Sequence, residues 1–600
     1  MQAIILAAGM GKRLGELTKN NTKCMISVHG KTLIEKTLDI LEKTEVKRVI
    51  LVIGYQGEKL KKFIGSSYKG LEIIYVENEI YYKTNNIYSL YLASDYLIED
   101  DTLLLESDLI FDEKIIFDLI AHPFPNLAVV SKYESWMDGT VVTIDKDDNI
   151  VRFIPKKHFK YQEISDYYKT VNIYKFSKAF SLESYVPFLK AYSSAIGNNE
   201  YYEQVLRVIV SLEKQDLKAY KLSAEKWYEI DDIQDLNNAE TVFGTENNKL
   251  ELFQKRYGGY WRFPHLKDFC YLVNPYFPND TMQNEMKCYF YDLLSQYPSG
   301  LDIQNILASK MFGCHSNQII VGNGAAELIN SLLTISNGTV GVIYPTFNEY
   351  PERVQANKLK TMYPKNENFS YSAKDLQKFS HDIDNLILIN PDNPSGNFIP
   401  VEDVIELADH LRKNNKKLIL DESFVDFTSK GATNSLIHKD LLNENPNMIV
   451  IKSISKSYGV PGIRLGVMAT SDSELLCRVK KNISIWNINS FAEFFLQIIG
   501  KYEGEYIEAC NKIASERDRF YGKLCKVPFL RVIPSQANYF LCEVKGKFSS
   551  TELTDLLLRK YDIFIKDCKG KAGFDNKNYV RIAVRDFDDN EYLTEILHSI

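Results

Sequence analysis

Three features are scarce in this sequence, and each absence excludes a class of protein. No apolar run reaches the roughly 18 residues that a membrane-spanning helix needs. Lysines and arginines are spread along a chain of net charge −7, without the basic block typical of nucleic-acid binding. The nine cysteines include no Cys-x-x-Cys pair, which argues against a disulfide framework or a zinc site. We therefore expect a soluble, cytoplasmic protein with small-molecule partners, no nucleic acid and no membrane.

The length and the alternation of apolar segments predict an α/β protein of at least two domains. At 600 residues the chain exceeds one ordinary hydrophobic core. Strands are expected at 48–53, 71–76 and 102–106 and a helix at 59–64, and the same rhythm continues with strands at 318–321, 339–344, 385–390 and 417–421. The polar stretch near residue 244 is the best candidate for a boundary. We predict domains at 1–243 and 256–600, joined by a linker at 244–255.

A glycine-rich basic loop follows the first apolar strand. Small residues let backbone N–H groups approach phosphates, and Arg13 and Lys23 could neutralise a leaving pyrophosphate. A tight turn with a solvated basic pair is the alternative for the loop alone. The predicted nucleotide-binding residues are Leu6, Ala8, Gly9, Gly11, Arg13, Lys23, Asn85 and Asp108.

Two carboxylates complete this predicted nucleotide site. Asp108 follows the apolar run Leu103 to Leu105, at the strand end where open α/β sheets bind ligands, and Asp231 follows Trp227 to Ile230. Together they could hold Mg²⁺ between a nucleotide α-phosphate and an attacking oxyanion. Each alone is more often a strand-end cap.

Aromatic and acidic residues near predicted strand ends favour an amine-bearing acceptor. Tyr133, Trp136, Asp138 and Trp227 could hold an ammonium group through cation–π and charge contacts, and Lys156 could receive the anionic end. Packing of the two tryptophans in the core is the equal alternative.

The second half contains a lysine suited to a pyridoxal phosphate Schiff base. Lys456 lies among serines and glycines, Asp421 ends a strand where it could face the pyridinium nitrogen, and Asn393 could donate to the ring oxygen. Phe347 could stack on the ring. The predicted phosphate cup consists of Gly324, Ala325, Ala326, Ser453, Ser455 and Arg464.

These motifs resemble two known families. Residues 1–243 resemble the sugar-phosphate nucleotidyltransferase superfamily, in particular the small choline-phosphate cytidylyltransferases, through the opening loop, Lys23, Asn85 to Ser89, Asp108 and Tyr228 to Asp235. The resemblance implies a Rossmann-like fold, CTP as substrate and Asp108 and Asp231 as metal ligands.

Residues 256–600 resemble the fold-type I, class I and II aminotransferases, in particular histidinol-phosphate aminotransferase and threonine-phosphate decarboxylase. The motifs are Asn390 to Gly396, Asp421 to Phe424 and Ser453 to Arg464, in family order and spacing. Phe424 stands where relatives commonly have tyrosine. The resemblance implies that Lys456 binds the cofactor, that Arg581 binds a substrate carboxylate, and that Tyr260 and Tyr297 reach a neighbouring subunit's site in a homodimer.

A shared intermediate would explain the fusion of the two halves. The chain resembles fusions of a phosphonate cytidylyltransferase with a 2-aminoethylphosphonate transaminase, which implies transamination of phosphonoacetaldehyde by an amino donor and CMP transfer from CTP to the product. The alternative is a phosphocholine or phosphoethanolamine cytidylyltransferase joined to a phospho-amino-acid decarboxylase or a histidinol-phosphate-type aminotransferase. A non-catalytic sensor is a further alternative, and the intact Lys456, Asp421, Asp108 and Asp231 argue against it.

Overall fold

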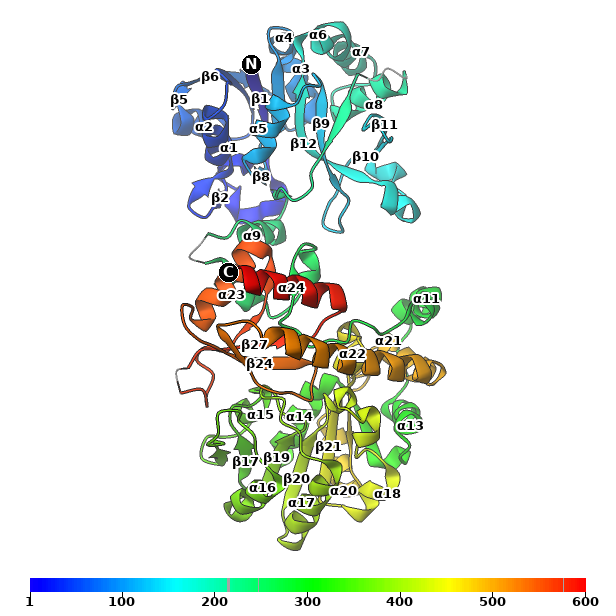
Figure 1. The fold of residues 1–600 in the computed structure, drawn as a ribbon. Helices are drawn as coiled ribbons and strands as arrows, with labels where there is room; N and C mark the ends of the chain where they lie inside the picture. Colours follow the sequence, from blue (N-terminus) through cyan, green and yellow to red (C-terminus); the bar gives the residue numbers. More distant parts are fainter. Residues whose placement is uncertain (213–215, 246–247, 576) are drawn as a thin grey trace. The chain divides into compact units, whose positions relative to one another are not determined.

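The computed structural model describes residues 1–212, 216–245, 248–575 and 577–600. It divides the chain into two compact units, Met1–Pro264 and His265–Ile600 (Figure 1). The described residues of 244–255, the segment predicted as a linker, belong to the first unit and include most of helix α10 (Lys249–Arg256). Among the described residues, no helix is both long and apolar enough to cross a membrane.

The first unit is built on one large sheet with the order β11-β10-β12-β7-β1-β4-β6-β5, in which β9 pairs with β12 and β13. Its strands are β1 (Gln2–Ala7), β4 (Arg48–Ile53), β5 (Ser67–Tyr68), β6 (Leu71–Glu77), β7 (Thr102–Glu106), β9 (Leu127–Lys132), β10 (Val141–Ile144), β11 (Ile150–Ile154), β12 (Tyr168–Phe176) and β13 (Lys218–Lys221). The helices are α1 (Leu33–Glu42), α2 (Gly57–Ile64), α3 (Asn86–Leu92), α4 (Ser94–Leu97), α5 (Lys114–Ala121), α6 (Lys178–Phe180), α7 (Val186–Ala195), α8 (Glu203–Ser211), α9 (Ile233–Val242) and α10.

Both faces of this sheet are covered, because its central strands are apolar on both sides. In β1, Ile5 belongs to one buried cluster and Ile4 to another, as expected for successive residues that point to opposite faces. Strands β4 and β7 flank β1 in parallel, and Leu6 pairs with Glu106. The predicted α/β fold is confirmed, and parallel strands direct the loops after β1 and β7 to one edge of the sheet.

The second unit has a seven-stranded sheet of order β16-β22-β21-β20-β19-β17-β18, in which β22 is antiparallel to both neighbours. Its strands are β16 (Ile319–Asn323), β17 (Val340–Ile343), β18 (Leu359–Met362), β19 (Asn385–Ile389), β20 (Lys417–Asp421), β21 (Met448–Ser453) and β22 (Leu465–Ala469). A smaller antiparallel sheet contains β23 (Leu530–Val532), β24 (Tyr539–Val544), β27 (Tyr579–Ala583) and β26 (Lys566–Asp567).

The helices of this unit pack on both of its sheets (Figure 1). They are α11 (Asp280–Cys288), α12 (Phe290–Ser295), α13 (Leu301–Phe312), α14 (Gly324–Ile335), α15 (Glu349–Glu352), α16 (Ala373–Phe379), α17 (Val401–Lys413), α18 (Lys439–Glu444), α19 (Ile454–Ser457), α20 (Ser473–Lys481), α21 (Ser490–Ile498), α22 (Glu503–Leu524), α23 (Ser550–Tyr561) and α24 (Phe587–Ser599). The strands predicted at 385–390 and 417–421 are confirmed as β19 and β20. Their carboxyl ends carry the motifs assigned to pyridoxal phosphate.

Candidate functional sites

A pocket of about 410 Å³ opens at the carboxyl ends of β1 and β7 in the first unit. Its walls include every residue that the sequence predicted for the nucleotide: Leu6, Ala8, Gly9, Gly11, Arg13, Lys23, Asn85 and Asp108. Asp231 and Asp138 also line it. Segments separated by up to about two hundred residues of sequence thus form one pocket, as expected where parallel strands end together.

The glycine-rich loop turns sharply before it reaches Arg13. Gly11 has φ +59°, and a Cβ there would lie 3.1 Å from the Thr18 methyl carbon and 3.3 Å from the Lys23 Cβ. Glycine is therefore required by both backbone conformation and space. The turn allows the loop to fold against Lys23, so that the two predicted cations line the same pocket.

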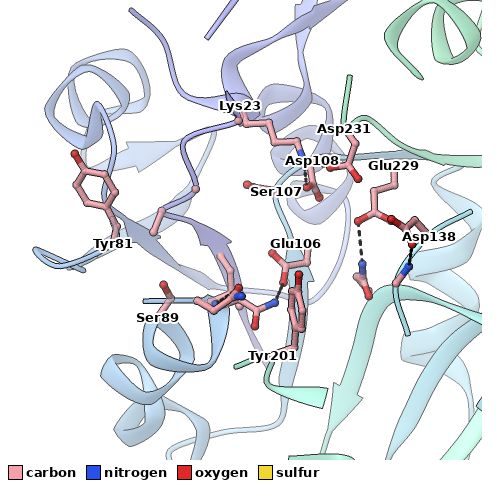
Figure 2. Close-up of a pocket in the computed structure, with 18 of the residues that line it drawn as sticks. Lys23, Tyr81, Ser89, Glu106, Ser107, Asp108, Asp138, Tyr201, Glu229 and Asp231 are labelled. Atoms are coloured by element: carbon pink, nitrogen blue, oxygen red, sulfur yellow. Dashed lines mark hydrogen bonds and ion pairs between the residues drawn. The ribbon is translucent and has the colours of Figure 1, made fainter. Parts of the chain in front are cut away.

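Lys23 bridges the two predicted metal-binding carboxylates (Figure 2). Its Nζ donates to Asp108 and, at 2.7 Å, to Oδ1 of Asp231. Arg13 lies 2.8 Å from the other Asp231 oxygen. Burial alone would lower the pKa of Lys23, but the two carboxylates raise it, so the lysine carries its charge.

A third carboxylate, Glu229, completes a group that could hold a metal ion. One oxygen each of Asp108, Glu229 and Asp231 lie within 4.8 Å of one another. Oδ1 of Asp108 is buried without a hydrogen-bond partner among the described residues, so an acceptor is available for a hard cation. Burial, with the nearby acidic groups, raises the pKa of Glu229 to about 7. The sequence analysis did not assign Glu229, although it ends β14 (Trp227–Glu229) two residues before Asp231, and residues two apart in an extended chain share a face.

Four of the five residues predicted for the acceptor meet in two pairs, Asp138 with Lys156 and Trp136 with Trp227, whose ring centres are 5.0 Å apart. Only Asp138 lines the pocket, and one of its oxygens pairs with Lys156 at 2.7 Å. Trp227 is 6% exposed in the core, and Trp136 stacks on Tyr228 with ring centres 4.0 Å apart. The Tyr133 ring packs 4.9 Å from the ring of Phe159. Core packing therefore accounts for Trp227, and Trp136 and Tyr133 pack against neighbouring aromatic rings.

Lys456 lies in α19, directly after β21, and its Nζ is 3.9 Å from the centre of the Phe424 ring and 5.6 Å from that of Phe347. Burial lowers the pKa of Lys456 to about 8. A larger fraction of this amine is therefore neutral near pH 7 than in an ordinary lysine, which suits a nucleophile for an aldehyde.

Asp421 is held by two hydrogen-bond donors that the sequence analysis did not predict. Tyr350 donates to its Oδ2 at 2.9 Å, and the Ser423 amide donates to its Oδ1. Asn393 accepts a 2.8 Å bond from Arg581. The Arg581 Nε is buried without a partner in the described chain, so this guanidinium retains a donor for an anion. Arg581 also lowers the pKa of Lys456, behind burial, which indicates that the two groups are near one another.

The predicted phosphate cup lies where α14 begins. Gly324 has φ +74°, and a Cβ there would approach an Arg464 guanidinium nitrogen to 2.7 Å. A Cβ on Gly466 would lie 2.4 Å from the Ala325 amide nitrogen. The Ser455 Oγ is buried without a partner in the described part of the chain. Open amides, an arginine and an unpaired hydroxyl fit a phosphate, so these residues suit pyridoxal phosphate.

Tyr260 and Tyr297, which were predicted to reach the site of a neighbouring subunit, occupy different environments. Tyr260 belongs to the first unit and donates to the Phe253 carbonyl. Tyr297 is 79% exposed, and its ring stacks 4.4 Å from that of Trp486.

Comparisons with known proteins match both units. Residues 299–599 match the family described as Aminotransferase class I and II, and residues 3–147 match the MobA-like NTP transferase domain. The chain belongs to the class I and II aminotransferase family. Its full length is 30% identical to CMP-5'-(3-aminopropyl)phosphonate synthase of Streptomyces rubellomurinus, over 100% of this chain and 95% of that one.

The second unit alone has further relatives. L-serine phosphate decarboxylase of Campylobacter jejuni is 30% identical over 56% of this chain and 88% of that protein. The crystal structure of histidinol-phosphate aminotransferase from Clostridium acetobutylicum is 28% identical with a TM-score of 0.50, over 56% of this chain and 98% of the other. The protein is therefore an enzyme that joins a nucleotidyltransferase domain to a pyridoxal phosphate-dependent domain, and the latter is similar to both decarboxylases and aminotransferases.

Proposed function

We propose that this enzyme makes a CMP-aminoalkylphosphonate, with the second unit generating the amine and the first unit transferring CMP to the phosphonate. The observation that carries the proposal is the three-carboxylate group of the first unit, with Lys23 and Arg13 beside it, in a chain whose full-length relative is named for such a product.

The first unit has the groups that in-line nucleotidyl transfer requires. Asp108, Glu229 and Asp231 would hold Mg²⁺, which supplies charge stabilisation at the α-phosphate. Arg13 and Lys23 would neutralise the departing pyrophosphate. A phosphonate oxygen attacks the α-phosphorus of CTP, the bond to pyrophosphate breaks, and the products are the CMP ester and pyrophosphate. The choice of CTP rests on the name of the full-length relative.

The second unit is proposed to act as a decarboxylase. An aminoalkylphosphonate forms when an α-amino acid with a terminal phosphono group loses CO₂, and 2-amino-4-phosphonobutyrate would give 3-aminopropylphosphonate. The similarity to L-serine phosphate decarboxylase supports this class, since that substrate also combines an α-amino acid with a phosphorus oxyanion.

Residues of this unit fit the decarboxylation. Bound pyridoxal phosphate would supply an electron sink for the carbon that loses CO₂. Lys456 would hold the cofactor and return a proton to that carbon, Asp421 would keep the ring nitrogen protonated, and Arg581 would bind one anionic end of the substrate.

Transamination of phosphonoacetaldehyde to 2-aminoethylphosphonate is the second candidate. The similarity to histidinol-phosphate aminotransferase supports it. The residues assigned to the cofactor and substrate would serve either reaction: Lys456, Asp421, Asn393 and Arg581. Both candidates deliver an amine on a short carbon chain that ends in a phosphorus oxyanion. We expect a homodimer through the second unit in either case.

Product analysis distinguishes these reactions. Purified protein with CTP, Mg²⁺ and pyridoxal phosphate is incubated with 2-amino-4-phosphonobutyrate, L-serine phosphate, or phosphonoacetaldehyde plus an amino donor. The proposal predicts CO₂ release from a phosphono amino acid and a ³¹P signal for a phosphonate–CMP linkage. Amine formation that requires phosphonoacetaldehyde and a donor would favour transamination. CMP transfer only to phosphoesters would contradict the phosphonate assignment.

A further inference from the structure

We propose that Glu203 and Glu106 form the end of the nucleotidyltransferase pocket that binds the primary ammonium group of the acceptor. This inference rests on the proposed function and assigns its amine-recognition site. It replaces the set of aromatic residues and Asp138 that the sequence favoured.

Glu203 lines the pocket but lacks a partner for one oxygen. Glu203 is the first residue of α8 and is only 6% exposed. Its Oε2 has no hydrogen-bond partner among the described residues. A buried carboxylate oxygen without a donor is unfavourable, because it has lost its hydrogen bonds to water. A cationic ligand in the pocket would remove that cost. Burial raises the pKa of Glu203, and the charge of Lys169 offsets only part of that effect.

Asn86 brings Glu106 to the same part of the pocket. Its Nδ2 donates to Oε1 of Glu106 at 2.9 Å, and its Oδ1 accepts from the Tyr202 amide at 3.0 Å. Asn86 thus ties the end of β7 to the segment that starts α8. Tyr201, which is labelled with Glu106 in Figure 2, also lines the pocket, so the pocket offers an aromatic ring as well as carboxylates.

The neighbouring cations are engaged with other carboxylates. Nζ of Lys169 donates to the Thr170 carbonyl at 2.6 Å and lies 3.6 Å from Glu229. Lys23 bridges Asp108 and Asp231. Lys23 and Lys169 therefore form ion pairs with the three-carboxylate group, and the charge of Lys169 also lowers the pKa of Glu203.

The spacing fits a short aminoalkyl chain. Glu106 ends β7 and Asp108 lies two residues later, in the turn before β8 (Leu109–Phe111), so their Cα atoms are at most about 7 Å apart. A phosphonate near the metal group could therefore place an amine two or three carbons away beside Glu106 and Glu203, since each single bond is about 1.5 Å long.

The chemistry favours a primary over a quaternary ammonium. An –NH₃⁺ group offers three donors, which match the free Glu203 oxygen and the remaining acceptors of Glu106. A trimethylammonium group offers none, so the carboxylates would remain without hydrogen bonds. We expect aminoalkylphosphonates to be preferred to phosphocholine.

The test compares ligands that differ only in the amine. CMP transfer to 3-aminopropylphosphonate and to propylphosphonate is measured for the wild type, Glu203→Gln and Asp138→Asn. Glu203→Gln should raise the KM for 3-aminopropylphosphonate by about tenfold to a hundredfold, leave the KM for CTP within about twofold, and remove the preference for the amine. Asp138→Asn should retain that preference.

Several outcomes would overturn the inference. These are an unchanged amine preference in Glu203→Gln, an equal rise in the KM for CTP, or a preference lost only in Asp138→Asn. Intact reaction of the second unit and an unchanged circular dichroism spectrum confirm folding. If Glu203→Gln does not fold, Glu106→Gln is measured in the same way.

Equilibrium binding separates this inference from the proposed function. Both phosphonates are titrated into the protein with Mg²⁺ and a non-hydrolysable CTP analogue. The wild type could bind the amine-bearing phosphonate more tightly and Glu203→Gln lose this difference, while neither ligand accepts CMP. That result would refute the proposed function and retain the ammonium site. Equal binding of the two ligands by the wild type would refute the site even if transfer occurs.

Discussion

Nζ of Lys23 lies 2.7 Å from Oδ1 of Asp231, although the two residues are 208 positions apart in the sequence. Through this contact and its bond to Asp108, the lysine occupies the space between two carboxylates that could bind a metal. A metal ion would therefore compete with Lys23 for these carboxylate oxygens, and a triphosphate would compete with the carboxylates for Lys23.

Loss of a metal-binding carboxylate should disable only the first unit. Asp231→Asn is expected to lower the kcat of CMP transfer by orders of magnitude, because a cation that supplies several kcal/mol at the α-phosphate is held less well. Steady-state rates over a Mg²⁺ titration test this. Glu229→Gln should act in the same direction, and full activity of both variants at low Mg²⁺ would refute the metal site.

Lys456→Ala should abolish the reaction of the second unit and leave CMP transfer nearly intact. Each unit contains its own set of reactive groups, and Lys456 is the amine that holds the cofactor. Absorbance of the purified variant reports covalently bound pyridoxal phosphate, and CMP transfer to added aminoalkylphosphonate reports the first unit. An equal loss of both activities in a folded variant would contradict independent sites. Lys452→Ala is not a suitable control, because that lysine forms a buried ion pair with Asp426.

The depressed pKa of Lys456 predicts how cofactor uptake depends on pH. With the pKa lowered to about 8, the neutral amine rises about tenfold per unit below pH 8 and levels off above it. The initial rate of covalent pyridoxal phosphate incorporation into the apoprotein should follow this curve. A rate that keeps rising toward pH 10 would indicate an ordinary lysine.

Trp227 should matter for stability more than for acceptor binding. Its side chain is buried in the core of the first unit, so Trp227→Ala should destabilise the fold by about 3 to 5 kcal/mol. Urea unfolding of the full chain, followed by circular dichroism, measures this. Trp227→Phe retains much of the volume and should cost less; a rise in the acceptor KM without loss of stability would instead support an ammonium contact.

The sequence by itself determined the strand ends and the order of the motifs. The apolar run before Asp108 predicted β7, and the run before Asp421 predicted β20, because alternation and length of apolar segments are local properties. The loop at Gly11 and the segment around Lys456 were identified in the same way, since glycines and a reactive lysine are visible without knowledge of distant contacts.

Tertiary structure decided which side chains meet. The two-residue spacing of Glu229 from Asp231 is a local signal, but only the fold brings Glu229 within reach of Asp108. The bond between Tyr350 and Asp421 joins residues 71 positions apart, and Trp227 proved to be a core residue. The unpartnered oxygen of Glu203 could not be predicted either, because an unsatisfied buried atom is defined by everything packed around it.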